Sequence, residues 1–73
     1  MGQWSSTKAR KVLAALKKMG WRVKRQTRSH KVLERAGWND YVFAFRDSEE
    51  IGSWMLARIA KKTGLTPEDL SGL

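Results

Sequence analysis

Apolar residues recur at steps of three and four residues between Ser6 and Gly20. The positions that form this stripe are Ala9, Val12, Leu13, Leu16 and Met19. The spacing predicts an amphipathic helix that Ser5 or Ser6 caps and that runs to about Met19. Gly20 is expected to end this helix by adopting the left-handed backbone conformation.

The pattern then changes to the alternation that is typical of strands. Residues 21–26 alternate, with Lys24 and Arg25 on opposite faces, and predict a half-buried strand. Two further strands are predicted at His30–Arg35 and Tyr41–Arg46, because polar turns precede each of them. The short connections make the three strands an antiparallel meander.

The next apolar run predicts a second helix. Asp47 is expected to cap this helix, and Glu50, three residues on, completes a capping box. Gly64 ends the helix. Thr66 and Pro67 then predict a short last helix, because threonine caps helices and proline favours the first helical position.

These elements give a single domain of the α+β class over residues 1–73, with the order α-β-β-β-α and a short C-terminal helix. A three-stranded antiparallel sheet of this size seats both long helices on one face. The opposite face is left open to solvent, and we expect the functional side chains there.

Most aromatic residues are expected to pack rather than to bind a ligand, because two helices must be seated on one small sheet. The aromatic residues predicted to lie in the core are Tyr41, Phe43, Phe45, Trp21 and Trp54. Trp38 lies in a Gly-Trp-Asn-Asp turn, where burial is difficult. It either contacts a ligand or a partner protein, or packs on the domain.

Charge is distributed unevenly along the chain, whose formal net charge is +8. Residues 1–33 contain ten lysines and arginines and no acid, whereas all seven acids lie from Glu34 onward, with five basic residues. A one-sided positive field is typical of nucleic-acid-binding proteins, although a merely solubilising basic face has the same composition. A nucleic acid is the favoured polyanion.

The composition argues against several other chemistries. The chain has no cysteine and one histidine, so we expect no disulfide and no metal site. No glycine-rich phosphate loop and no Ser–His–Asp order occurs, so we expect no small-molecule cofactor and no protein nucleophile. The chain starts without a long apolar run, which predicts a soluble, cytoplasmic protein without membrane contact.

His30 is the candidate for acid–base chemistry, because histidine is the side-chain type whose ordinary pKa lies near neutral pH. It lies in the acid-free half, close to Arg25, Arg28 and Lys31. If Leu33 fills the core, strand alternation places His30 on the open, basic face. On these grounds alone, an ordinary surface histidine and a catalytic histidine both remain open.

Short motifs in a characteristic order extend over nearly the whole chain. They are Ser6, Leu13, Leu16, Gly20-Trp21, Val23-Lys24-Arg25, Ser29-His30-Lys31-Val32-Leu33 and Lys61-Lys62-Thr63-Gly64-Leu65-Thr66. In this order and spacing the chain resembles the HicA family, which consists of small mRNA-cleaving toxins paired with HicB antitoxins. The resemblance implies a fold similar to a double-stranded-RNA-binding domain.

The resemblance also implies an endoribonuclease with His30 as its catalytic residue, since His30 matches the family's essential histidine. The residues expected to hold RNA around it are Lys24, Arg25, Arg28, Ser29 and Lys31. The implied partners are mRNA and a HicB-like antitoxin. Arg28 stands where the family has glycine, so we expect an ordinary backbone conformation at this position.

Two alternatives remain. The same fold can hold RNA without cutting it, as a non-catalytic RNA-binding module. A DNA-binding module is the other alternative, but no recognition-helix pattern supports it.

Overall fold

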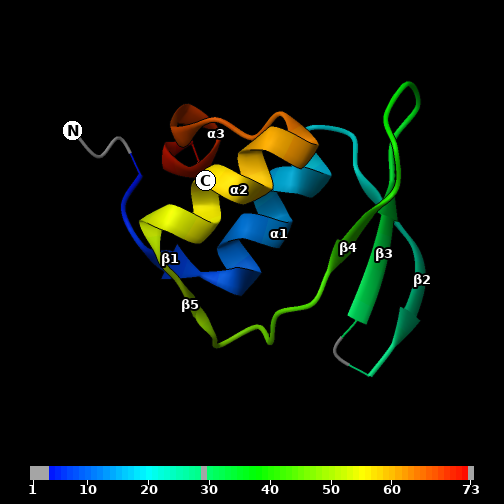
Figure 1. Ribbon diagram of the computed structural model, residues 1–73, viewed down its shortest axis with the longest axis horizontal. Coiled ribbons are helices and arrows are strands. Elements are labelled where there is room, and N and C mark those ends of the chain that lie inside the picture. Colours follow the sequence, from blue (N-terminus) through cyan, green and yellow to red (C-terminus); the bar gives the residue numbers. More distant parts are fainter. Residues whose placement is uncertain (1–3, 29, 73) are drawn as a thin grey trace.

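The computed structural model describes residues 4–28 and 30–72 (Figure 1). In chain order its elements are β1 (Thr7–Lys8), α1 (Ala9–Lys18), β2 (Arg22–Thr27), β3 (His30–Glu34), β4 (Tyr41–Phe43), β5 (Glu50–Ile51), α2 (Ser53–Thr63) and α3 (Pro67–Ser71). The predicted α+β class is confirmed, with two helices, a three-stranded antiparallel sheet and a short last helix. The prediction missed β1 and β5, which pair with each other in a second, two-stranded sheet.

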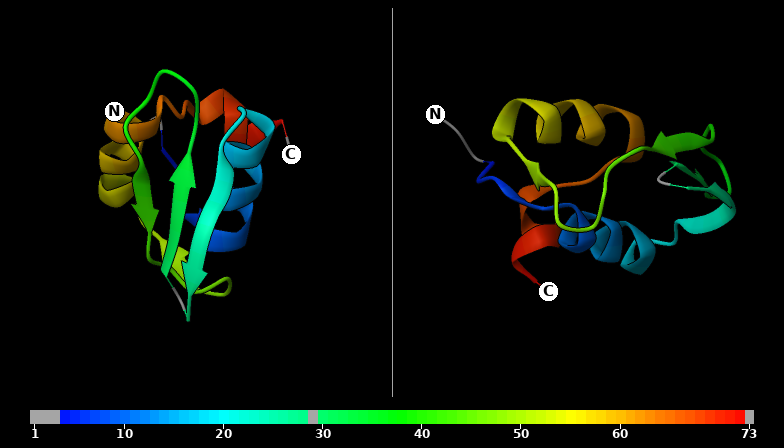
Figure 2. Two further views of the ribbon diagram at one scale, coloured as in Figure 1. Left: turned by 90° about the vertical axis from the view of Figure 1, so that its right-hand side faces the viewer. Right: turned by 90° about the horizontal axis from the view of Figure 1, so that it is seen from below.

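The main sheet has the strand order β2-β3-β4, as a meander requires. Leu33, in the middle of β3, lies opposite Val23 on β2 and Tyr41 on β4. Figure 2 shows α1 and α2 together on one side of this sheet and no helix over the other side. β4 ends at Phe43, three residues before the predicted end of the third strand.

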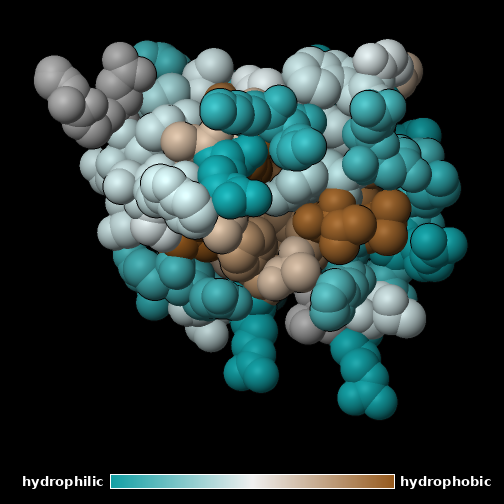
Figure 3. Space-filling model, in the orientation of Figure 1, coloured by the Kyte–Doolittle hydropathy of each residue, from teal (hydrophilic) through white to brown (hydrophobic). Residues whose placement is uncertain are grey.

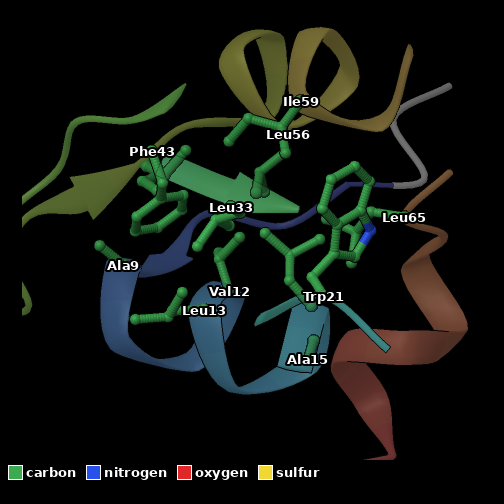
Figure 4. Packing of buried hydrophobic residues seen from close by; sticks show 12 residues of the cluster. Ala9, Val12, Leu13, Ala15, Trp21, Leu33, Phe43, Leu56, Ile59 and Leu65 are labelled. Carbon is green, nitrogen blue, oxygen red and sulfur yellow. The ribbon is translucent and has the colours of Figure 1, made fainter. Parts of the chain in front are cut away.

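Side chains from the sheet and from both helices meet in one apolar core (Figure 4). Its members are Ala9, Val12, Leu13, Ala15, Leu16, Trp21, Leu33, Phe43, Ile51, Leu56, Ile59 and Leu65. The stripe predicted for the first helix is thereby confirmed, although Met19 is only partly buried. Tyr41 and Phe45 are partly buried against the same core, and Phe43 is fully inside it, as predicted.

Trp21 joins the ends of the two long helices. Its side chain is buried, and its indole Nε1–H donates a hydrogen bond to the backbone oxygen of Thr63 at 3.3 Å. Its backbone N–H donates to the oxygen of Leu16 at 3.0 Å. A buried indole N–H requires such an acceptor, so the core position of Trp21 depends on the last turn of α2.

The first turn of α1 is capped by a distant loop. No side chain caps α1 at Lys8, contrary to the predicted serine cap. The N–H groups of Ala9 and Arg10 donate instead to the backbone oxygens of Glu49 (2.8 Å) and Asp47 (3.1 Å). These are N–H groups that a helix cannot satisfy internally.

The same loop explains why α2 begins at Ser53 and not near the predicted cap at Asp47. The carbonyls of Asp47 and Glu49 accept hydrogen bonds from the first turn of α1, and Glu50 pairs with Lys8 across the small sheet. The predicted capping box at Asp47 is therefore wrong. The predicted helix end at Gly64 is confirmed, since Gly64 has a left-handed φ of +80°.

The C-terminal signals act as predicted. Thr66 accepts a hydrogen bond from the N–H of Asp69, and the Asp69 carboxylate accepts one from the N–H of Thr66. With Pro67 at the first helical position, this capping box starts α3.

Candidate nucleic-acid interface

The sheet surface opposite the helices is called the open face (Figure 2, left). The strand pairing assigns it Arg22, Lys24, Arg25, Thr27, His30, Val32, Glu34 and Val42. Val32 and Val42 face each other across β3 and β4 at its centre. Polar and charged residues make up the rest, so this face carries a small apolar strip inside a charged border.

A β-bulge in β2 places Lys24 and Arg25 on the same face. The pairing changes from Val23 opposite Leu33 to Arg25 opposite Val32, which leaves Lys24 as the extra residue. The prediction that Lys24 and Arg25 lie on opposite faces is therefore wrong. The extra residue shifts every later side chain of β2 by one position, which strict alternation cannot foresee.

His30 lies on the open face at the first position of β3. It is exposed and lies opposite Thr27, the last residue of β2. Leu33 is completely buried on the other side of the same strand. The predicted placement of His30 is confirmed, because residues three apart on a strand point to opposite faces.

The turn that precedes His30 contains a strained backbone. Arg28 has φ of +51°, in the left-handed region, so the expectation of an ordinary conformation there is wrong. Thr27 and His30 pair directly, which leaves room for only two residues in the turn. Tight two-residue turns require positive φ, whichever residue occupies them. Arg28 therefore takes up a conformation that glycine would adopt without strain.

Lys24 is held by a carboxylate on the same face. Its Nζ donates a hydrogen bond to Asp40 Oδ2 at 2.9 Å. This hydrogen bond and the negative charge of Asp40 raise the pKa of Lys24. A phosphate group must compete with Asp40 for Lys24, which makes this predicted RNA contact weaker than its sequence position indicates.

Arg22 is paired in the same way, with Glu34 Oε2 at 3.3 Å from its Nη2. By contrast, no ion pair within residues 4–28 and 30–72 involves Arg25 or Arg28. Both side chains are exposed. The cations most available near His30 are therefore Arg25 on β2 and Arg28 in the turn.

Lys31 does not join this group. Strand pairing places it opposite Gln26 and Phe43, on the helix-covered side of the sheet that Leu33 also faces. Of the predicted RNA-binding residues, Lys24 and Arg25 thus share the open face with His30, Arg28 lies in the turn before His30, and Lys31 lies on the opposite side of the sheet. Ser29 lies outside the described residues.

Trp38 and Trp54 are both exposed in part, but only Trp38 packs against the core. Trp38 packs edge-on against Trp21, with ring centroids 5.8 Å apart, and Arg35 lies over its ring. A Cβ atom at Gly64 would lie 2.8 Å from the Trp38 ring, so this glycine is required for the contact. Trp38 therefore packs on the domain with one part of its ring. Trp54 was predicted in the core, which is wrong, because its side chain is 69% exposed.

Glu34 and Asp40 each form an ion pair that the sequence did not predict. Both carboxylates lie on the open face and neutralise a cation there. Glu34 could have been found, since it is four residues after His30 and shares its face of the strand. Asp40 gave no such signal, because it lies in a turn whose position depends on the tertiary fold.

The fold and this face define a small α+β domain that presents an exposed histidine together with arginines on an uncovered sheet face. None of the described helices is long and apolar enough to cross a membrane. Residues 9–65, which include the whole main sheet and both long helices, match the family model described as HicA toxin of bacterial toxin-antitoxin. The chain belongs to the HicA toxin family, as its motifs indicated. No curated protein sequence matches the chain closely enough to count as a relative.

Proposed function

We propose that this toxin is an endoribonuclease that cleaves mRNA on its open face, with His30 as general acid or base. The observation that carries the proposal is the position of His30, which is exposed on the uncovered side of the sheet. Leu33 and Phe43 build the core from the opposite side of the sheet, so His30 is not needed for packing. Family membership supports a toxic activity of this kind.

The reaction uses a nucleophile that RNA itself supplies. The 2′-hydroxyl attacks the adjacent phosphorus, the bond from phosphorus to the 5′-oxygen breaks, and a 2′,3′-cyclic phosphate forms. The proton of the 2′-hydroxyl leaves to a base, and the departing 5′-oxygen gains a proton. His30 takes one of these two steps, which typically accelerates such a reaction about 10²–10⁴-fold. Water takes the other step.

Arg25 and Arg28 provide positive charge around this reaction. Arg25 is two residues from Thr27, the direct neighbour of His30, and Arg28 is in the turn that joins them. Guanidinium groups so placed stabilise the charge that develops on the phosphate. Lys24 contributes less, because Asp40 already binds it.

A HicB-like antitoxin is the proposed partner. It inhibits by covering the open face and presenting carboxylates to Arg25 and Arg28. Charge complementarity of this kind chiefly raises the association rate and the specificity. The partner therefore competes with RNA for the same cations.

The test compares wild type with His30→Ala on a labelled RNA. Cleavage by wild type should release fragments with 5′-hydroxyl ends, and His30→Ala should reduce the rate about 10²–10⁴-fold. Thr27→Ala is the matched control, since Thr27 is an exposed side chain directly opposite His30. Thermal unfolding of each variant shows whether the fold is intact.

The outcomes separate the possible functions. A folded His30→Ala variant that still cuts RNA would show that His30 is not catalytic. If wild type binds RNA without cutting it, the chain is an RNA-binding module. An unfolded His30→Ala variant would assign His30 a structural role, which its exposure argues against.

A further inference from the structure

The outer side of α2 carries an exposed tryptophan that the fold does not use. Trp54 is 69% exposed, the largest fraction among the exposed large hydrophobic side chains of the described chain. A tryptophan gains most of its stabilising free energy from burial, and Trp54 forgoes most of it. Packing within the domain therefore does not account for this residue.

Basic residues surround the Trp54 ring. The guanidinium carbon of Arg58 lies 5.0 Å from the ring centroid, one helical turn further on. Trp54, Arg58, Lys61 and Lys62 together line a surface hollow of about 380 Å³. α2 has no acidic residue between Ser53 and Thr63, so the charge of this hollow is not balanced within its own helix.

An Arg–Trp pair at this spacing stabilises a helix slightly on its own. That contribution explains the contact of Arg58 with one face of the ring. Lys61 and Lys62 lie in the last turn of α2, where cations favour the helix dipole, but in the same hollow they also repel Arg58 and each other. An anionic ligand removes this repulsion.

We propose that the Trp54 hollow binds single-stranded RNA, with a base stacked on Trp54 and phosphates held by Arg58, Lys61 and Lys62. The proposal rests on the ribonuclease function of the open face. It adds that the RNA strand bound there also contacts the Trp54 hollow. An aromatic face beside cations is the arrangement by which proteins hold single strands without reading their sequence.

The surface between the open face and the Trp54 hollow can accommodate an RNA strand. Arg58 is close enough to Tyr41, the first residue of β4, for its charge to counteract the rise that burial causes in the Tyr41 pKa. Figure 3 shows an apolar band that runs from below α2 toward β4, with hydrophilic side chains around it. Val42 on β4 is 51% exposed and belongs to the open face. An RNA strand that leaves the open face can therefore pass β4 and reach α2 over apolar surface.

A protein partner fits this hollow less well. A stable protein interface buries on the order of 800 Å² on each side, and although tryptophan and arginine are common in it, lysine is depleted. Here one aromatic ring lies among three cations. The chemistry favours bases and phosphates over an apolar protein surface.

The experiment measures binding of a fluorescent 2′-O-methyl oligoribonucleotide to the wild-type protein. This probe lacks the 2′-hydroxyl nucleophile and is not cut. With a probe of roughly 12 nucleotides, Trp54→Ala should weaken binding about 5- to 150-fold, the range for loss of one stacked base. Trp54→Phe should restore most of the affinity, because phenylalanine retains an aromatic face.

The salt dependence distinguishes stacking from charge. Trp54→Ala should leave the slope of log K against log salt unchanged, whereas Lys62→Ala should make it shallower by about 0.7. Lys17→Ala, an exposed lysine on α1, is the matched control for charge. In NMR spectra, the Trp54 indole N–H signal, identified by its loss in Trp54→Phe, should shift when the probe is added. The signal of the buried Trp21 should not.

Each result has a defined meaning. If wild type binds the probe and Trp54→Ala binds it equally well, the hollow is not an RNA site, while the proposed function stands. If wild type does not bind RNA at all, both proposals fall. If Trp54→Ala weakens binding of a HicB-like antitoxin but not of the probe, the hollow belongs to the protein partner and the proposal is wrong.

Discussion

Removing two carboxylates from the open face should strengthen RNA binding. Glu34 and Asp40 each hold one cation, Arg22 at 3.3 Å and Lys24 at 2.9 Å. Glu34→Gln with Asp40→Asn keeps the shape of both side chains and removes their charge. The two cations then become available to phosphates without any new basic residue.

The magnitude follows from counterion release. Each phosphate contact of a single strand changes the slope of log K against log salt by about −0.7, so two further contacts change it by about −1.4. Between about 50 and 200 mM salt, the loss of affinity should then be about sevenfold greater for the double variant than for wild type. Fluorescence anisotropy with the uncleavable probe measures both slopes.

A matched control separates a local effect from a general gain of positive charge. Asp47→Asn with Glu68→Gln changes the net charge by the same amount, but Asp47 lies in the loop before β5 and Glu68 in α3. This control should leave the slope nearly unchanged, because charges away from the bound strand are screened within about 10 Å. Equal slopes for the two double variants would refute the idea that the open face holds RNA through Arg22 and Lys24.

Two further predictions concern the strained turn and a half-buried hydroxyl. Arg28→Gly should raise the free energy of unfolding by about 0.5–1 kcal/mol, because glycine adopts the left-handed φ without strain; Arg28→Ala, which keeps the strain, should not. Thermal melts that show no gain for Arg28→Gly would contradict the strain. Burial raises the pKa of Tyr41 above its ordinary value of 10.0, so the folded state binds this proton more tightly than the unfolded state does. Stability should therefore fall as the pH rises from about 10 toward the higher folded pKa, and Tyr41→Phe should lose less stability over this window in urea titrations.

The parts of the fold that the sequence predicted are those with local causes. The apolar stripe of α1, the helix end at Gly64 and the threonine cap at Thr66 each depend on residues within a few positions. Local signals also gave the order of the strands and placed His30 on the open face. These features are confirmed because side-chain period and backbone preference act over one or two turns.

The features that were missed depend on contacts between distant segments. The capping box predicted at Asp47 fails because Thr7 and Lys8 pair with Ile51 and Glu50, which keeps that segment extended. The bulge at Lys24 and the ion pair with Asp40 likewise exist only in the assembled sheet. At the candidate site the histidine was therefore predictable, whereas the availability of each cation was not.

The capping of α1 by the loop at Asp47 and Glu49 has a consequence for synthesis of the chain. α1 has ten residues, and a helix of that length is marginal in isolation. Its first N–H groups find their acceptors only when Asp47 and Glu49 have left the ribosome. β1 must wait for β5 in the same way. We therefore expect folding to be completed late in translation, because a chain that ends before Asp47 lacks the acceptors for the first turn of α1.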